Sequence, residues 1–443
     1  MASPQDTHRK LQGPVGGTRI LVGLEEAMRI TDEVAPFSVV SVFRLKGSLP
    51  VPVLRAALDE LQRRHPLLRA RILPEGKAHA YHFDVAGPIP VEVADRTGAD
   101  HWVTVAEEEL GRRIDLSTGP LVRCRYLVDA DGGDLVVAIP HNILDATSAA
   151  PLFRELLGLC AGQAQPDAAE LVEEGRTPAP ALYPKGFTGA GLAMAAAGQM
   201  GRQMVDELQF RMQSRGVRQA PIHPIESGHC RILPLKFPAP LTAALIQASR
   251  QHRITLNSML SAAMLSAVQR QLYPSARVPL RHIIFSDLRS RLSRSIPDNM
   301  LGCFLTMFRL TVMVEQDGAF WDLARQVQEK TVRAAHSGER FVAYSMAPGM
   351  MKMIFRMKAF RMGATAVSYA GALEMGVAGG PFEVIGVHAF AANMTLGPEL
   401  SGLARLFRGE LYWDLLYLDS DMDAAGAHAA AGQIRAILES ATS

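Results

Sequence analysis

This sequence of 443 residues has little cysteine, little excess charge and no long hydrophobic run. Its four cysteines, at positions 124, 160, 230 and 303, form no Cys-x-x-Cys pair, which argues against a disulfide framework or a zinc site and favours a reducing cytoplasm. A net charge of only +2 provides no basic surface for nucleic acid. The longest candidate membrane span, 187–200, is 14 residues long, whereas a span needs about 18. We therefore expect no integral membrane protein.

Several familiar motifs are also missing. Residues 1–19 are polar and contain no apolar core of a secretory signal. There is no phosphate-binding loop and no Gly-x-Gly-x-x-Gly, and Gly-x-Ser-x-Gly is also absent, which argues against an esterase. Four scattered histidines do not complete a metal site at zinc-ligand spacing: His79, His82, His223 and His229. We expect no metal ion.

The composition is that of a folded chain, with 48% hydrophobic and 20% charged residues. Strand-like and helix-like segments alternate along the chain, which indicates an α/β fold. The unbroken apolar run 135–140 predicts a central strand that is covered on both faces. We divide the chain into an N-terminal half (1–162), a connecting segment (163–228) with an amphipathic helix near 191–214, and a C-terminal half (229–443).

The segment 139–148, with the sequence IPHNILDATS, carries the most informative side chains. His141 and Asp145 lie four residues apart, after the predicted central strand and before a predicted helix. A loop between a strand and a helix is a common place for a rigid scaffold to present a reactive group. The spacing alone also fits a structural histidine that satisfies or caps its own loop.

Further segments, in the same order along the chain, resemble the superfamily of thioester-dependent acyltransferases. This superfamily includes nonribosomal-peptide condensation domains, chloramphenicol acetyltransferase and polyketide-associated acyltransferases, and shares a His-His-x-x-x-Asp-Gly motif. His141 occupies the second histidine position and Asp145 the aspartate position, while Pro140 and Ala146 replace the flanking His and Gly. The other matching segments are RRHPLLRAR (63–71), IDLSTGPLVR (114–123), SDLRSR (286–291), DNMLGCF (298–304) and VSYAG (367–371).

The resemblance implies two chloramphenicol-acetyltransferase-like αβ halves that form a V-shaped pseudo-dimer around a central cleft or tunnel. It also implies transfer of an acyl group from a coenzyme A or acyl-carrier-protein thioester to a hydroxyl or amine, with His141 as the single general base. A thioester is already activated, so one positioned base is sufficient. The thioester is then a co-substrate, and no permanently bound cofactor is implied.

The resemblance further implies that Asp145 turns away from the histidine and pairs with an arginine of the second half, for which Arg289 is the candidate. Both residues would brace the loop that holds His141. The alternative is that Arg289 belongs to a solvated cluster of arginines at 277, 281, 289, 291 and 294.

Two different functions would fit the same motifs. One is a non-catalytic binding module of this fold, and the second is a condensation enzyme that forms amides on carrier-bound substrates only. The methionine-rich segment 349–362 is either an amphipathic helix over the core or an adaptable wall for an acyl chain, a lipid or a carrier protein. We expect a cytoplasmic monomer of secondary metabolism or lipid modification, with a small or lipid-like acceptor and an acyl or peptidyl carrier protein as a candidate partner.

Overall fold

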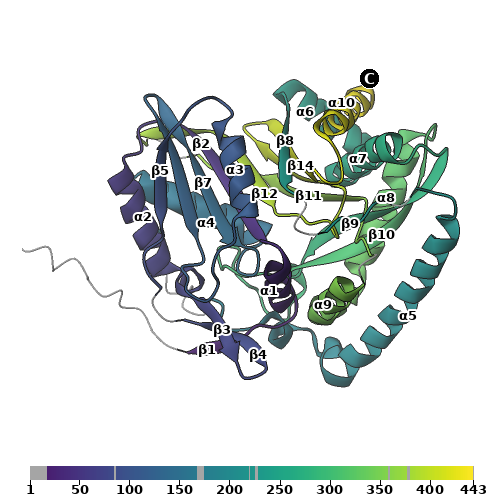
Figure 1. Cartoon of the computed structure of the whole chain (residues 1–443), viewed down its shortest axis with the longest axis horizontal. Coiled ribbons are helices and arrows are strands. Elements are labelled where there is room, and N and C mark those ends of the chain that lie inside the picture. The colour runs from purple at the N-terminus through teal and green to yellow at the C-terminus, as the bar shows by residue number, and fades with distance from the viewer. Residues whose placement is uncertain are drawn as a thin grey trace, which may run out of the picture.

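Two sheet-containing halves lie side by side in the computed structural model (Figure 1). The structure describes residues 17–83, 86–166, 174–218, 220–224, 228–357, 360–376 and 380–442. Each half has its own mixed sheet with helices packed on it, and the halves meet along one edge. The predicted α/β fold with two comparable halves in a V-shaped arrangement is confirmed.

The N-terminal half is built on a five-stranded sheet with the order β12-β2-β7-β6-β5. Its strands are β2 (Ser38–Gly47), β5 (Val91–Asp95), β6 (Arg123–Asp129), β7 (Gly132–Pro140) and β12 (Phe382–Ala391). Helices α2 (Val51–Arg64) and α4 (Ala146–Cys160) pack on one face, and α3 (His101–Gly111) packs on the other. Every residue of β7 is buried, which confirms the predicted central strand.

The C-terminal half is built on a six-stranded sheet with the order β10-β9-β11-β13-β14-β8. Its strands are β8 (Cys230–Phe237), β9 (Arg277–Asp287), β10 (Leu305–Glu315), β11 (Thr365–Ala372), β13 (Leu400–Phe407) and β14 (Glu410–Leu418). One face is covered by α6 (Ala239–Gln251), α7 (Leu256–Leu272), α8 (Phe320–His336) and α10 (Ala424–Ser440).

On the other side of the C-terminal half, α1 (Leu24–Val34) packs against α9 (Glu339–Arg356). A small third sheet, in the order β1-β4-β3, is formed by β1 (Thr18–Ile20), β3 (Arg71–Glu75) and β4 (Ala78–His82). Short 3-10 helices are η1 (Pro66–Arg69), η3 (Ala179–Leu182), η4 (Lys185–Phe187) and η6 (Arg289–Arg291).

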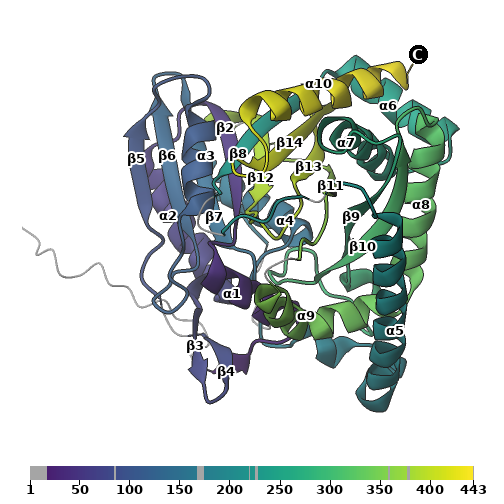
Figure 2. The same cartoon turned by 45° about the vertical axis from the view of Figure 1, so that its right-hand side comes forward.

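One strand crosses between the halves. β12 comes from the C-terminal part of the chain but pairs antiparallel with β2, so that the N-terminal sheet is completed by residues 382–391 (Figure 1). The connecting segment contributes the long helix α5 (Gly189–Gln213), which packs beside α9 at the edge of the C-terminal half (Figure 2). The division at 163–228 stays a prediction, and β12 is the segment that it does not anticipate.

Two predicted elements need correction, and five further elements were not predicted. The apolar segment 67–73 predicts a strand, but it begins within η1, because Pro66 fixes its φ angle and starts a tight turn, and extended backbone begins only at Arg71. The helix expected at 349–362 is shifted: α9 ends at Arg356, and residues 358–359 lie outside the described residues. The sequence pattern also does not indicate α1, β5, β11, β12 or β13.

No helix among the described residues combines the length and the apolar character that crossing a bilayer requires.

Candidate active site

His141 is the first residue after β7, in the short loop that leads into α4. Its backbone N–H donates to the carbonyl oxygen of Phe37 at 3.2 Å, and its ring stacks on the Phe37 ring with centroids 5.8 Å apart. Its Nδ1 lies 2.9 Å from the carbonyl oxygen of Leu144. The main-chain carbonyl groups of Phe37 and Leu144 therefore fix the position of the imidazole.

The Leu144 contact also fixes which ring nitrogen carries the proton. A carbonyl oxygen only accepts, so Nδ1 must be the N–H donor and Nε2 keeps its lone pair in the neutral ring. Burial lowers the pKa of His141 below its ordinary value, although the contact with Leu144 acts in the opposite direction. Within the described part of the chain Nε2 has no hydrogen-bond partner. The ring is thus neutral and has one free basic nitrogen.

His141 lines a cavity of about 240 Å³ between the two sheets. Side chains of β2, α4 and β12 form the wall on the N-terminal side, and β9, β11 and β13 form the wall on the C-terminal side. Most of the lining is apolar, including Val39, Phe43, Phe153, Leu373 and Met375. The cavity is therefore suited to an apolar substrate group next to a neutral base.

Asp145 caps α4 and does not contact the imidazole. Its Oδ1 accepts from the backbone N–H and the hydroxyl of Ser148, both at 3.0 Å, in a capping box. Its Oδ2 accepts from the backbone N–H of Phe304 and from Nη1 of Arg289, both at 2.8 Å. These four bonds occupy the carboxylate, so Asp145 is not a partner of His141.

Arg289 is buried, which excludes the alternative of a solvated arginine face at this position. Its guanidinium contacts Asp145, Asp287 at 3.3 Å and the carbonyl oxygen of Met300 at 3.4 Å, and lies over the Phe304 ring. Thr147 in α4 also donates to Asp287 at 3.2 Å. The structure thus brings Asp145 and Arg289 together across the junction of the halves, directly behind the His141 loop.

The two departures from the family motif cause no visible strain. Pro140 is the last residue of β7, opposite Ser38 of β2, and the strand reaches it without interruption. Ala146 is the first residue of α4 and is not among the described residues with a positive φ angle, so glycine is not required there. Its methyl group lines the cavity beside His141.

The later motif segments also reach the cavity. Ser286 and Asp287 from SDLRSR, and Ser368 and Tyr369 from VSYAG, line its C-terminal wall. The methionine-rich residues 349–357 do not, so this segment is not the wall of the described cavity. Met351 and Ile354 of α9 instead pack in the cluster around α1.

A buried polar cluster beside the cavity was missed at the sequence level. Asp414 on β14 accepts from Nδ1 of His388 at 2.9 Å, from the Ala389 backbone at 3.2 Å and from Arg405. Arg405 also donates to the carbonyl oxygen of Val387 at 2.8 Å. These bonds join β12 to β13 and β14, and no motif could have revealed them because the three side chains come from different strands.

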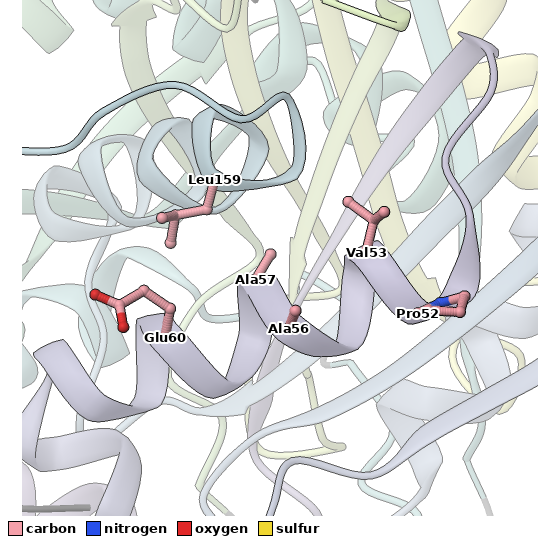
Figure 3. A pocket seen from close by; sticks show the side chains of 6 residues that line it. All are labelled: Pro52, Val53, Ala56, Ala57, Glu60 and Leu159. Carbon is pink, nitrogen blue, oxygen red and sulfur yellow. The ribbon is translucent and has the colours of Figure 1, made fainter.

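A second hollow, of about 370 Å³, lies between α2 and α4 (Figure 3). It is lined by Pro52, Val53, Ala56, Ala57, Glu60 and Leu159. Glu60 is its only ionisable lining residue and is paired with Arg63 at 2.6 Å. The lining of this hollow has no imidazole, hydroxyl or thiol, so the cavity at His141 is the better candidate for chemistry.

Residues 17–83 and the other described ranges contain no group of three or more His, Cys, Asp or Glu arranged to hold a metal ion. The four cysteines are buried and free. Burial raises the pKa of each of the thiols of Cys124, Cys160, Cys230 and Cys303, so they stay protonated and are poor nucleophiles.

Two family models match the chain. The condensation domain family matches residues 30–172, which include the His141 loop. The family described as the C-terminus of phthiocerol/phthiodiolone dimycocerosyl transferase matches residues 226–358, which include Arg289. The two matches therefore fall on either side of the cavity.

Sequence relatives are distant and much longer. Phosphinothricin tripeptide synthetase PhsC of Streptomyces viridochromogenes is 25% identical over 323 residues, which cover 67% of this chain and 27% of that protein. The chain spans about a quarter or less of the length of the curated relatives that it matches.

Solved structures with the same fold cover nearly the whole chain. Trichothecene 15-O-acetyltransferase TRI3 of Fusarium sporotrichioides has a TM-score of 0.74 at 12% identity, covering 98% of this chain and 97% of that one. Polyketide synthase associated protein 5 of Mycobacterium tuberculosis has a TM-score of 0.66 at 15% identity, covering 96% and 99%. At these identities the likeness establishes the fold.

Proposed function

We propose that the chain is an acyltransferase of the superfamily that unites condensation domains with polyketide-associated acyltransferases, a proposal supported by the two family matches and by the shared fold. The donor is a coenzyme A or carrier-protein thioester, and the acceptor is a hydroxyl or amine. The reaction takes place in the cavity between the sheets, with His141 as the general base. The observation that carries this proposal is the free Nε2 of a neutral imidazole at the wall of an apolar cavity at the junction of the halves.

The chemistry needs one proton acceptor and correct alignment. Nε2 of His141 takes the proton of the acceptor hydroxyl or amine as its oxygen or nitrogen attacks the thioester carbonyl carbon. The carbon–sulfur bond then breaks, and the imidazolium returns the proton to the departing thiolate. Nδ1–H stays bonded to Leu144 throughout, so the ring does not have to turn. Asp145 and Arg289 are positioning residues, because neither touches the imidazole.

The lining supports an apolar acyl or acceptor group. The small side chains Ala146, Ala149 and Ala150 leave space along α4, and Phe153 lies farther along the same helix. From Asp145 to Phe153 the helix rises about 12 Å, enough to accompany an extended chain of several carbons. Ser286 and Ser368 are small polar residues on the opposite wall that could contact a polar group of the donor or acceptor.

The direct test replaces His141 and a matched histidine. His428 on α10 makes the same kind of bond, from Nδ1 to the carbonyl oxygen of Ala424 at 2.7 Å, but it is exposed on the surface. With a panel of acyl thioesters and amine or alcohol acceptors, His141→Ala should lower kcat by about 10² to 10⁴. His428→Ala should leave kcat unchanged. Equal turnover by wild type and His141→Ala would reject the role of His141, whereas no turnover of any donor by wild type would favour a non-catalytic binding module.

The kind of donor requires a separate comparison. The curated relatives are large synthetases, which favours a carrier-bound donor, whereas the match to a dimycocerosyl transferase favours a stand-alone acyltransferase. The same acyl group should therefore be offered on coenzyme A and on a phosphopantetheinylated carrier protein. Transfer from coenzyme A supports the acyltransferase, and transfer from the carrier alone identifies a condensation enzyme.

A further inference from the structure

Helix α5 packs against the C-terminal sheet through its polar side chains. Asp206 and Glu207 point to the C-terminal sheet, where Arg281, Arg309 and Thr311 hold them. Glu207 lies 2.9 Å from Arg281 and 3.2 Å from Arg309, and Phe210 stacks under the Arg281 guanidinium. An amphipathic surface helix normally buries its apolar stripe and exposes its charges. In α5 this arrangement is reversed.

The apolar residues of α5 consequently face outward. The large exposed side chains are Met194, Met200, Met204, Val205, Leu208 and Met212, with exposed fractions from 51% to 73%. At 100° per residue all six fall within an arc of about 140°, and the array extends about 27 Å along the helix. In Figure 1 α5 runs along the outer edge of the C-terminal half, and in Figure 2, where this side comes forward, α5 lies in the foreground. An exposed apolar array of this size marks an interaction surface.

The unpaired charges on α5, on α9 and directly after α5 are cationic. The three carboxylates of α5 and α9, Asp206, Glu207 and Glu339, are all in ion pairs with arginines. By contrast, the exposed Arg215, Lys352 and Arg356 have no ion pair within the described part of the chain. The neighbouring helix α9 also exposes Met346 and Met353, and Met357 directly follows it. The surface therefore combines unpaired positive charge with flexible apolar side chains.

From this combination we infer that the outward face of α5, together with the exposed residues of α9, docks the protein on an anionic lipid surface. Unbranched methionine side chains adapt to a fluid environment, and the unpaired cations match lipid phosphates. A second copy of the chain fits less well, because two such faces would bring together cations with no free carboxylate. A folded protein partner fits less well too, since the exposed face of α5 has no aromatic anchor. This inference of lipid binding does not depend on the acyltransferase reaction proposed above.

The test is flotation of the full chain with vesicles of phosphatidylcholine alone or mixed with an equal amount of phosphatidylglycerol. We expect binding to the mixed vesicles that weakens as salt is raised, and little binding to phosphatidylcholine alone. Met204→Glu with Leu208→Glu should lower the bound fraction by about tenfold or more. The matched control is Val93→Glu with Ile385→Glu, which changes two exposed apolar residues of the N-terminal half and the net charge equally. It should stay within about twofold of wild type.

Each outcome supports or contradicts the binding of the α5 face to anionic lipid. Equal binding of the α5 variant and wild type, or no binding to anionic vesicles, would overturn it. A wild-type dimer in analytical ultracentrifugation that the α5 variant converts to a monomer would assign the face to a second copy. Unfolding curves of both variants exclude a folding defect. His141→Ala should still bind vesicles, and the α5 variant should still turn over water-soluble substrates, so failure here is distinguishable from failure of the proposed function.

Discussion

The carboxylate of Asp145 lies 2.8 Å from Nη1 of Arg289 and makes no hydrogen bond to His141, four residues before it. The pair spans the junction of the halves, since Asp145 begins α4 and Arg289 follows β9. His141 is held instead by the main chain of its own loop and by Phe37. The site therefore separates the group that reacts from the groups that maintain its position.

The buried pair should be essential for stability. Replacing Arg289 by Ala leaves Asp145 as an uncompensated charge in a dry environment, and the free energy of unfolding should fall by about 3–5 kcal/mol. Arg291→Ala, at an exposed position two residues away, is the matched control and should change it by less than about 0.5 kcal/mol. Urea denaturation followed by circular dichroism measures both. Equal midpoints for the two variants would contradict the bracing role.

The lowered pKa of His141 predicts the acid limit of activity. Burial disfavours the charged ring, so the base is neutral throughout the neutral pH range and loses its lone pair only when protonated at lower pH. The profile of kcat/KM should therefore be flat near neutrality, and its acid limb should have a midpoint below the ordinary histidine value of about 6.5. A midpoint at or above that value would show that a different group, or a solvated imidazole, controls the reaction.

The buried His65 should make the protein less stable at alkaline pH. His65 is buried with Nδ1 2.8 Å from Glu174 and Nε2 3.3 Å from Glu155. Burial alone would lower its pKa, but the two carboxylates more than offset this and raise the pKa to about 9. The stabilisation is thus complete below the unfolded value of about 6.5 and is lost as the pH rises through about 9, on the order of 3 kcal/mol in total.

The variant His65→Gln isolates this contribution. Its free energy of unfolding should be lower than that of wild type at pH 6, and the difference between them should narrow as the pH approaches 10. Equilibrium urea unfolding at a series of pH values gives both curves. Parallel curves for the two proteins would mean that His65 is not charged in the folded state.

Space along α4 should determine the length of the transferred or accepted chain. Ala150→Phe places a ring in the cavity beside Phe153, so long acyl donors should lose kcat/KM by about tenfold or more, whereas acetyl donors change little. Ala429→Phe, at an exposed position on α10, is the control. A uniform loss for short and long donors in Ala150→Phe, together with a lowered melting temperature, would indicate overpacking rather than selection.

Much of the architecture was already readable in the sequence. The apolar run 135–140 predicts a doubly covered strand, and the structure places it at the centre of the N-terminal sheet, because an all-apolar strand needs cover on both faces. The motif segments indicated the superfamily and the His141 loop. By contrast, β12 alternates buried and exposed residues over part of its length like any edge strand, so nothing local showed that it would complete the sheet of the other half.

The sequence by itself determined the residue types of the site and their order along the chain: an imidazole after a buried strand, an aspartate before the next helix, and an arginine in the second half. Only the tertiary structure decided that Arg289 reaches Asp145, that Glu174 reaches His65, and that α5 packs with its acidic side inward. The reason is that a helical or strand period reports which residues share a face, but not which face the rest of the chain offers as a partner. In α5 the buried Arg281 and the partly buried Arg309 of the sheet bind the acidic face, and so the apolar face remains exposed.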